Sequence, residues 1–275
     1  MAKTVVLTGA SDGIGAAAAE QLARRGHQLV LVGRSPEKTA QVAERVAARA
    51  WFSADYEKLE EVRALARDIR RVCPRIDVLA NNAGGLFSGP HRTQDGFERT
   101  FQVNHLAGFL LTRELLDVLL RSRAAVVNTS SIGAKLFGHI DITDLNDWRR
   151  YRPNKAYGDS KLANILFTKG LCQRYGQDGL TSVAFHPGNV ATRFASATTS
   201  YFHWIYQTPL KVFLISPEKG ASNLVYFIEG TPGRDWQSGQ FYGSHRRIAK
   251  TNPQADDADL IQAHWEASAS FLELS

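Results

Sequence analysis

The stretch TVVLTGASDGIG, residues 4–15, decides the fold of this 275-residue chain. It begins as a short apolar strand and turns at Gly9, Gly13 and Gly15, and a helical segment is expected over residues 14–25. Glycines at such a turn let the backbone approach a phosphate closely, and the free N–H groups of the helix start attract the anion. The stretch therefore predicts the first strand–turn–helix unit of a dinucleotide-binding domain, with an ordinary strand–helix turn as the alternative.

The rest of the chain alternates between short apolar strands and helical segments. Strands that are apolar on both faces, as in a parallel sheet between helix layers, are expected over 28–32, 49–54, 77–82, 124–130 and 181–186. Further helices are expected over 36–49, 56–72, 96–119 and 156–175. The alternation predicts one α/β domain over residues 1–275, a doubly wound parallel sheet with a late edge strand at GQFYG, 239–243.

Two segments interrupt the alternation. Residues 135–154 form a polar insertion that carries Asp, Arg and Trp, and residues 195–216 are rich in aromatic side chains. Long connections at the carboxyl ends of strands are commonly functional, so we expect the second segment to be a mobile substrate lid. A subunit interface, a packed core or a patch that touches a membrane are the alternatives for it.

The net charge of +6 does not by itself indicate a nucleic-acid partner, because the basic residues are dispersed in short doublets with acids between them. Cys73 and Cys172 are too few for a disulfide framework or a zinc site, and the histidines are spread singly, so no metal is expected. Strand-like sequence starts at Thr4, which predicts no signal peptide or membrane anchor and a cytoplasmic location.

The run AYGDSKLANILFT places Tyr157 and Lys161 four residues apart, on one face of the expected helix. Most such pairs are solvated neighbours, but beside a dinucleotide the pair can form a proton-donating centre. An ammonium about 4 Å from a phenol contributes ~4 kcal/mol at an effective dielectric of about 20, which would lower the tyrosine pKa by roughly three. Desolvation opposes this effect, so we expect the attraction to win where water still reaches Lys161.

The turn in the form TG-x-x-x-G-x-G and the Tyr-x-x-x-Lys pair together resemble the short-chain dehydrogenase/reductase family, classical type, from Thr4 to about Gly243. The resemblance implies a Rossmann-type fold and an oxidoreductase that interconverts a hydroxyl and a carbonyl of a small molecule. It implies that Tyr157 transfers the proton, Lys161 tunes it, and Asn104 holds a water that links the lysine to solvent. The substrate oxygen would be oriented by Ser131, with Ser130 as the neighbouring alternative.

The separation between the serines and Tyr157 is longer than is usual in the family. With the run SKLANILFT, residues 160–168, this length resembles the retinol-dehydrogenase-like branch. The branch implies a lipophilic alcohol or ketone as substrate.

The family also implies where a nucleotide would bind, mostly at the ends of successive strands. The implied residues are Gly9, Ser11, Asp12, Gly13, Ile14, Gly15, Arg34, Asp55, Tyr56, Asn82, Ala83, Gly84, Tyr157, Lys161, Pro187, Gly188, Val190 and Thr192. Asp55 would meet the adenine, although it could also cap a helix. Residues 81–84, NNAG, match the family signature beside the adenosine ribose, and the segment from Pro187 to Thr192 matches the part that lines the nicotinamide.

The second expected strand ends at Gly33-Arg34, where an NAD-selective site normally carries a carboxylate for the ribose 2′-hydroxyl. Gly33 offers none, whereas Arg34 could hold a 2′-phosphate and Lys38 could add positive charge. We therefore expect NADP(H) rather than NAD. Asp12 argues the other way, because many NADP-using relatives have a basic residue there, and Arg34 could simply cap a surface turn.

Short-chain dehydrogenases commonly form dimers or tetramers through the helix that carries the Tyr–Lys pair and its neighbour. The resemblance therefore implies a homodimer or homotetramer, through Asn164, Phe167, Thr168 and Leu171 together with residues 109–119. The alternative is that these side chains pack within the chain.

Three other kinds of function fit the sequence less well than an oxidoreductase. A catalytically silent dinucleotide sensor or scaffold would be expected to lose Tyr157 or Lys161, and both are present. An epimerase or dehydratase of the extended relatives would favour a differently spaced glycine turn and a larger carboxyl-terminal region. A nucleic-acid binder would need a basic face or an aromatic stacking platform.

Overall fold

The structure is a computed structural model that describes residues 2–146, 151–188 and 216–274. Its centre is a seven-stranded sheet with the order β3-β2-β1-β4-β5-β6-β7, in which all neighbouring strands are parallel. The strands are β1 (Thr4–Thr8), β2 (Gln28–Gly33), β3 (Ala50–Ser53), β4 (Val78–Asn81), β5 (Ala125–Thr129), β6 (Thr181–Phe185) and β7 (Gln240–Tyr242). The predicted doubly wound, Rossmann-type sheet is confirmed, and its late edge strand is β7.

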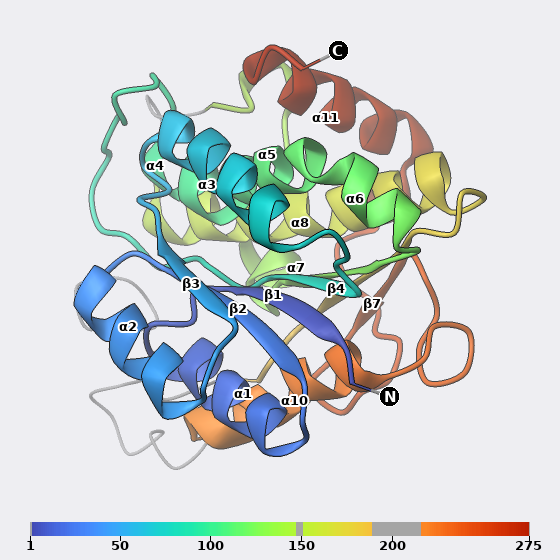
Figure 1. Ribbon diagram of the computed structural model, residues 1–275. Coiled ribbons are helices and arrows are strands. Elements are labelled where there is room, and N and C mark those ends of the chain that lie inside the picture. The colour runs from blue at the N-terminus through green and yellow to red at the C-terminus, as the bar shows by residue number, and fades with distance from the viewer. Residues whose placement is uncertain (1, 147–150, 189–215, 275) are drawn as a thin grey trace.

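Helices cover both faces of the sheet (Figure 1). One layer contains α1 (Gly13–Arg24), α2 (Pro36–Arg45) and α10 (Pro217–Glu229). The opposite layer contains α3 (Leu59–Val72), α4 (Arg99–Phe101), α5 (Ala107–Glu114), α6 (Leu116–Arg121) and α8 (Pro153–Tyr175). The strand order reverses direction between β1 and β4, and this switch point is where α/β sheets bind ligands.

The helix expected over residues 96–119 is not continuous. Between α4 and α5 the chain forms a π-helix, η1 (Gln102–Leu106), and a break at Leu115 separates α5 from α6. Within η1 the Asn104 carbonyl accepts a hydrogen bond from Asn164 Nδ2 at 3.0 Å. Single π-turns of this kind are frequent at functional sites, and their position is hard to predict because it depends on a partner from another helix.

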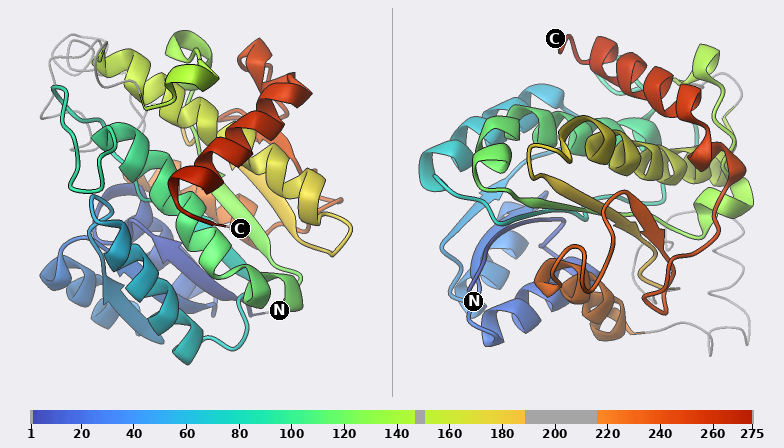
Figure 2. Two further views of the ribbon diagram at one scale, coloured as in Figure 1. Left: turned by 90° about the horizontal axis from the view of Figure 1, so that it is seen from above. Right: turned by 90° about the vertical axis from the view of Figure 1, so that its right-hand side faces the viewer.

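The carboxyl-terminal helix α11 (Ala258–Phe271) was not predicted, and it packs on α8 outside the sheet layers (Figure 2). Its Trp265 ring lies 5.8 Å from Phe167 and 5.0 Å from Phe109, between ring centroids. Phe167 is 2% exposed, and Thr168 and Leu171 are fully buried. The face predicted for subunit pairing is therefore covered by this chain's own helix, so that part of the prediction is wrong.

The insertion at residues 135–154 is only partly described. It begins within α7 (Gly133–Phe137) and contains the short helix η2 (Ile142–Asp144). The Asn252 amide donates to the carbonyls of Ala134 and Gly138, which holds the end of α7 against the carboxyl-terminal part of the chain. Residues 147–150 and the predicted lid, apart from Ser216, lie outside the described residues.

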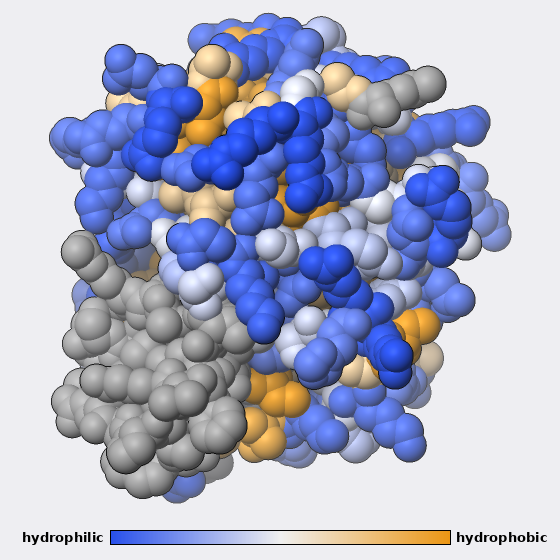
Figure 3. Space-filling view, turned by 90° about the horizontal axis from the view of Figure 1, so that it is seen from below, coloured by the Kyte–Doolittle hydropathy of each residue, from blue (hydrophilic) through white to orange (hydrophobic). Residues whose placement is uncertain are grey.

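The face shown in Figure 3 is mostly hydrophilic, with small separate hydrophobic areas. Among the described helices, none is both long and apolar enough to cross a bilayer.

Candidate functional site

The glycine turn lies at the carboxyl end of β1. Gly9 has a φ of +67°, and a Cβ added at Gly15 would lie 2.0 Å from the Gly9 carbonyl oxygen. A side chain at either position would be strained or would collide with backbone. Asp12 accepts a hydrogen bond from Gly13 N, so α1 begins directly at the turn. The predicted strand–turn–helix unit has the geometry expected for a phosphate site.

The NNAG segment packs directly on this turn across the switch point between β1 and β4. The Thr8 hydroxyl accepts hydrogen bonds from the backbone N of Asn82 and of Ala83, both at 3.0 Å. A Cβ added at Gly9 would lie 2.8 Å from Ala83 Cα. We call this junction of the glycine turn and the NNAG segment the nucleotide cradle. It has no room for a side chain at Gly9, so the residues present fit the close backbone approach that a dinucleotide requires.

Arg34 follows β2 directly and is exposed. The adjoining helix α2 is capped by Ser35, whose hydroxyl accepts from Lys38 N at 3.3 Å, so Arg34 is not the capping residue. Lys38 Nζ lies 3.5 Å from an Asp12 carboxylate oxygen, and both side chains are more than half exposed. Lys38 thus partly offsets the negative charge of Asp12, although an exposed pair of this kind interacts weakly.

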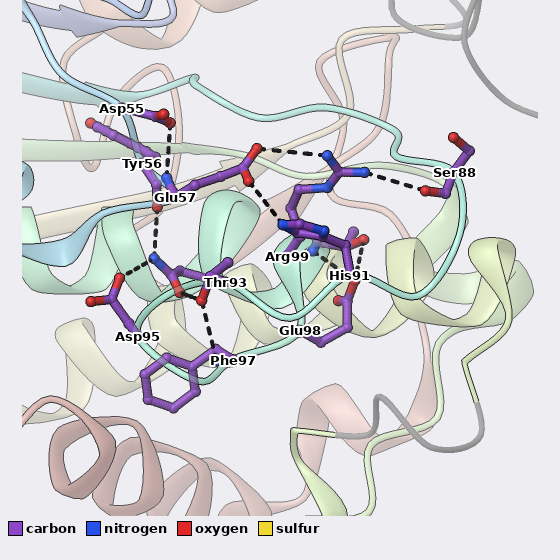
Figure 4. A network of polar contacts seen from close by, with 12 residues as sticks. Asp55, Tyr56, Glu57, Ser88, His91, Thr93, Asp95, Phe97, Glu98 and Arg99 are labelled. Carbon is purple, nitrogen blue, oxygen red and sulfur yellow. Dashed lines mark hydrogen bonds and ion pairs between the residues drawn. The ribbon is translucent and has the colours of Figure 1, made fainter.

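Asp55 and Tyr56 belong to a polar network that joins the end of β3 to η1 (Figure 4). The Asp55 carboxylate accepts from Glu57 N, while the first N–H of α3, at Leu59, is accepted by Asp95. Asp55 therefore shapes a turn before the helix, which starts three residues later than expected.

Tyr56 serves this network through its backbone. Its carbonyl accepts from Gln102 Nε2, a residue of η1, at 3.0 Å. Its side chain is buried, which raises the pKa of the hydroxyl. The Tyr56 ring therefore belongs to the core rather than to the surface of the site.

The Tyr157 ring and the Ser131 hydroxyl both lie next to Gly133. A Cβ added at Gly133 would lie 3.0 Å from Tyr157 Cε1 and 3.4 Å from Ser131 Oγ. Ser131 Oγ accepts from Gly133 N, which leaves its hydroxyl hydrogen free to donate. The neighbouring Ser130 instead donates to the Lys161 carbonyl at 2.7 Å. Of the two predicted serines, only Ser131 stands beside the tyrosine ring.

Lys161 lies one turn further along α8 than Tyr157 and points toward the Tyr157 ring. Its Nζ lies 5.7 Å from the Tyr157 ring centroid and donates to the Thr129 carbonyl at 3.2 Å. A Cβ added at Gly84 would lie 3.3 Å from this Nζ, so the NNAG segment borders the lysine directly. Lys161 is 3% exposed, and burial lowers its pKa to about 8. The lysine is therefore more desolvated than we expected from the sequence, and it loses its charge in the mildly alkaline range.

The Asn104 side chain clamps Gly85. Its Oδ1 accepts from Gly85 N at 2.7 Å, and its Nδ2 donates to Gly85 O at 2.9 Å and to Ser160 Oγ at 3.1 Å. The side chain thus fixes the loop after NNAG against α8, and the backbone carbonyl remains the group that faces Asn164.

Pro187 and Gly188 follow β6, and a residue that the sequence reasoning missed holds them in place. Asn223 of α10 donates to the Pro187 carbonyl and to the Ser244 carbonyl, both at 3.0 Å. Arg246 donates to Asn223 Oδ1 at 3.0 Å, which fixes the orientation of the amide. Nothing local in the sequence marks Asn223, because its partners lie more than twenty residues away. Val190 and Thr192 lie outside the described residues.

Across the described ranges 2–146, 151–188 and 216–274, no group of three His, Cys, Asp or Glu side chains could hold a metal ion. The Tyr157, Ser131 and Lys161 side chains provide donors for proton transfer and for orienting an oxyanion, and Gly84 joins this centre to the cradle at the switch point.

Comparison with known proteins identifies the family. The family model described as short chain dehydrogenase matches residues 3–201. The Streptomyces sp. (strain C5) protein DnrU, which is named as a daunorubicin C-13 ketoreductase, is 44% identical over 98% of this chain and 92% of its own length. Retinol dehydrogenase 13 of Homo sapiens is 36% identical over 99% of this chain and 85% of its own length.

Solved structures agree with these relatives. An uncharacterized protein from Mycobacterium paratuberculosis has a TM-score of 0.80 and 31% identity, with 99% of this chain and 94% of that chain covered. A short chain dehydrogenase from Shigella flexneri 2a str. 301, complexed with NADP, has a TM-score of 0.68 and 28% identity, with 88% and 97% covered. The chain therefore belongs to the short-chain dehydrogenase family, in its retinol-dehydrogenase-like branch, and is an oxidoreductase that acts on CH–OH groups.

Proposed function

We propose that this protein interconverts a hydroxyl and a carbonyl on a lipophilic small molecule with NADP(H). The observation that carries the proposal is the meeting of Tyr157, Ser131 and Lys161 at the edge of the nucleotide cradle, where Gly84 borders Lys161 Nζ. When bound there, a nicotinamide dinucleotide supplies or accepts the hydride.

The side chains have distinct roles in carbonyl reduction. The Ser131 hydroxyl accepts from Gly133 N and donates its own hydrogen to the substrate oxygen. The Tyr157 hydroxyl gives its proton to the oxygen as negative charge develops there, and the Lys161 ammonium stabilises the phenolate that remains. Asn104 holds Gly85 in place beside them. Oxidation of an alcohol runs through the same groups in reverse.

The charges at the end of β2 support NADP(H). Arg34 is exposed where the ribose 2′ position is expected, no carboxylate follows Gly33 directly, and Lys38 offsets Asp12. A relative complexed with NADP is consistent with this choice.

A lipophilic substrate is supported by the relatives and by one exposed apolar residue. Leu136 lies three residues after Gly133 on α7 and is 58% exposed, so it offers apolar surface on the helix that begins at Gly133. The names of the relatives, a retinol dehydrogenase and a daunorubicin ketoreductase, point to alcohols and ketones on large carbon skeletons.

The proposal also includes a cytoplasmic, homo-oligomeric enzyme. The free thiols of Cys73 and Cys172 are compatible with a reducing compartment. An oligomer would have to use a surface other than the α8 face that α11 covers. Light scattering at micromolar concentration tests this part, and a monomer mass alone would contradict it.

A screen of ketones and aldehydes, followed by NADPH absorbance, tests the function. Turnover of apolar ketones with NADPH, and slower turnover with NADH at equal concentration, is the expected result. A preference for NADH would overturn the cofactor assignment, and turnover restricted to small polar carbonyls would overturn the substrate class.

A further inference from the structure

A continuous line of hydrogen bonds connects Lys161 with the carboxyl-terminal helix. Lys161 Nζ and Asn164 Nδ2 both donate to the Thr129 carbonyl, at 3.2 and 3.3 Å. Asn164 Oδ1 lies 3.1 Å from His105 Nδ1, and His105 Nε2 lies 3.2 Å from Ser268 Oγ on α11. The five residues of this line are buried and come from four elements, β5, η1, α8 and α11.

The donors and acceptors in this line have one consistent assignment. Asn164 Nδ2 faces two carbonyls, of Asn104 and Thr129, and therefore must be the donor. Asn164 Oδ1 is then an acceptor, so His105 must carry its proton on Nδ1. The bare Nε2 of His105 accepts from the Ser268 hydroxyl. One neutral tautomer of His105 satisfies every contact.

The surroundings keep the His105 ring neutral. Phe101, Phe109 and Phe167 lie 5.4, 5.9 and 6.1 Å away between ring centroids, and His264 lies at 4.7 Å. Burial and, to a smaller extent, the nearby Lys161 charge lower the pKa of His105 to about 4, against the opposing effect of its hydrogen bond to Asn164. His105 therefore stays neutral near pH 7, and it acts through its fixed hydrogen bonds.

We propose that Asn164 and His105 are positioning residues of the catalytic centre, through which α11 fixes the carbonyl that holds Lys161. This inference rests on the proposed role of Lys161. His105 orients the Asn164 amide, which donates a hydrogen bond to the Thr129 carbonyl. This hydrogen bond fixes the direction in which the carbonyl points. Without that amide, Lys161 and its carbonyl would rearrange together, and the Asn104 carbonyl would lose one hydrogen bond while the Asn104 side chain keeps its bonds to Gly85.

The direction of the effect follows from charge. The N–H groups of Asn164 are the positive end of the amide dipole, and they share an acceptor with the Lys161 ammonium. They therefore disfavour the charged lysine and compete for its acceptor. Among the titratable groups that face Lys161 are Tyr157 from its own helix and His105 from η1, and His264 lies behind His105. Removal of the Asn164 amide should raise the pKa of Lys161.

The test measures Lys161 directly, without nucleotide or substrate. Protein that contains lysine labelled with carbon-13 at Cε is titrated by NMR, and Lys161→Arg assigns the signal. Asn164→Leu should raise the midpoint by roughly half to one pH unit, the equivalent of one lost hydrogen bond. His105→Phe should cause a smaller rise, and Ser268→Ala the smallest.

Thr168→Val is the matched control. Thr168 is fully buried one turn further along α8, and its hydroxyl donates to the backbone carbonyl of Asn164 rather than to the amide. The variant should leave the Lys161 midpoint unchanged. Equal shifts in Asn164→Leu and Thr168→Val, or no shift in Asn164→Leu and His105→Phe, would overturn the inference.

A second measurement reads His105 and remains available if Asn164→Leu does not fold. In protein labelled with nitrogen-15 histidine, the signal lost in His105→Phe should show the neutral form with the proton on Nδ1 at pH 7. A proton on Nε2, or a charged ring, would also overturn the inference. Once a substrate is known, His105→Phe should lower kcat roughly tenfold and leave the Kd of NADPH unchanged. Failure of the substrate screen alone would contradict the proposed function and leave both NMR results standing.

Discussion

Charged residues at the turns of the proposed nucleotide site are exposed, whereas the charged residue at the proposed proton-transfer centre is buried. Arg34 and Asp12 lie on turns next to glycines, and Lys38, in the first turn of α2, forms an exposed ion pair with Asp12. Lys161 is enclosed by α8, the end of β5 and the NNAG segment, and burial lowers its pKa to about 8.

The two regions should therefore respond differently to substitution. A solvated arginine contributes to affinity and little to stability, because its charge is hydrated with or without the ligand. A buried ammonium contributes to catalysis and reduces stability, because its desolvation is incompletely offset. Active sites commonly carry such a conflict between activity and stability.

The largest expected effect is on proton transfer. Tyr157→Phe should lower kcat by ~10²–10⁴-fold, because it removes the transferable proton and leaves the ring packed against Gly133. Steady-state kinetics with any substrate from the screen measures this loss, and the Kd of NADPH from nucleotide fluorescence should be unchanged. A kcat near the wild-type value would contradict the role of Tyr157.

Lys161→Met should abolish turnover and stabilise the protein. The pKa of Lys161 in the folded state, about 8, lies below the ordinary lysine value of 10.5, so the charge destabilises the native state by about 3 kcal/mol at neutral pH. The gain should be complete below pH 8 and should fade between pH 8 and 10.5, because the folded chain loses the proton first and the cost of that loss falls as the pH approaches 10.5. Denaturant unfolding at several pH values measures it.

Lys169→Met is the control for that substitution. Lys169 lies on the same helix and pairs with Asp256, whose side chain is 78% exposed. The change in its free energy of unfolding should stay within about 0.5 kcal/mol. Similar gains in both variants would show that burial of the Lys161 charge is not their cause.

Arg34→Ala should weaken NADPH binding by roughly tenfold to a hundredfold, the worth of a charge-assisted hydrogen bond, and leave NADH nearly unaffected. Titration of both nucleotides by fluorescence measures the difference. Arg24→Ala, at the exposed end of α1, should change neither affinity. Equal losses for both nucleotides in Arg34→Ala would indicate a structural role and remove the contrast between the two regions.

The smallest expected effect is a pH dependence. Carbonyl reduction needs the Tyr157 hydroxyl protonated and Lys161 charged, so kcat/KM for reduction should be level below pH 8 and decline above it. With the Lys161 pKa at about 8, the decline should approach tenfold per pH unit well above that value. A reduction rate that rises through this range would contradict the charged form of Lys161 as the active one.

Much of the fold and site could be predicted because the signals are local. The TGASDGIG turn lies between its own strand and helix, and Tyr157 and Lys161 share a face through helical spacing alone. The preference for Ser131 over Ser130 came from the family resemblance alone, since in the structure it depends on which hydroxyl meets the Lys161 carbonyl from α8. The α8 face predicted for subunit pairing was wrong for a similar reason, because that apolar face is covered by α11, a helix about a hundred residues away.

The sequence by itself determined the parallel sheet, the glycine turn and the residues of the proposed proton-transfer centre, because short-range spacing and backbone freedom depend only on neighbouring residues. Only the tertiary structure decided how those residues are surrounded. The burial of Lys161, the π-turn at Asn104 and the line from Asn164 through His105 to Ser268 bring together groups up to 163 residues apart. Their electrostatics depend on this enclosure, since exclusion of water sets both the pKa of a charge and the strength of its hydrogen bonds.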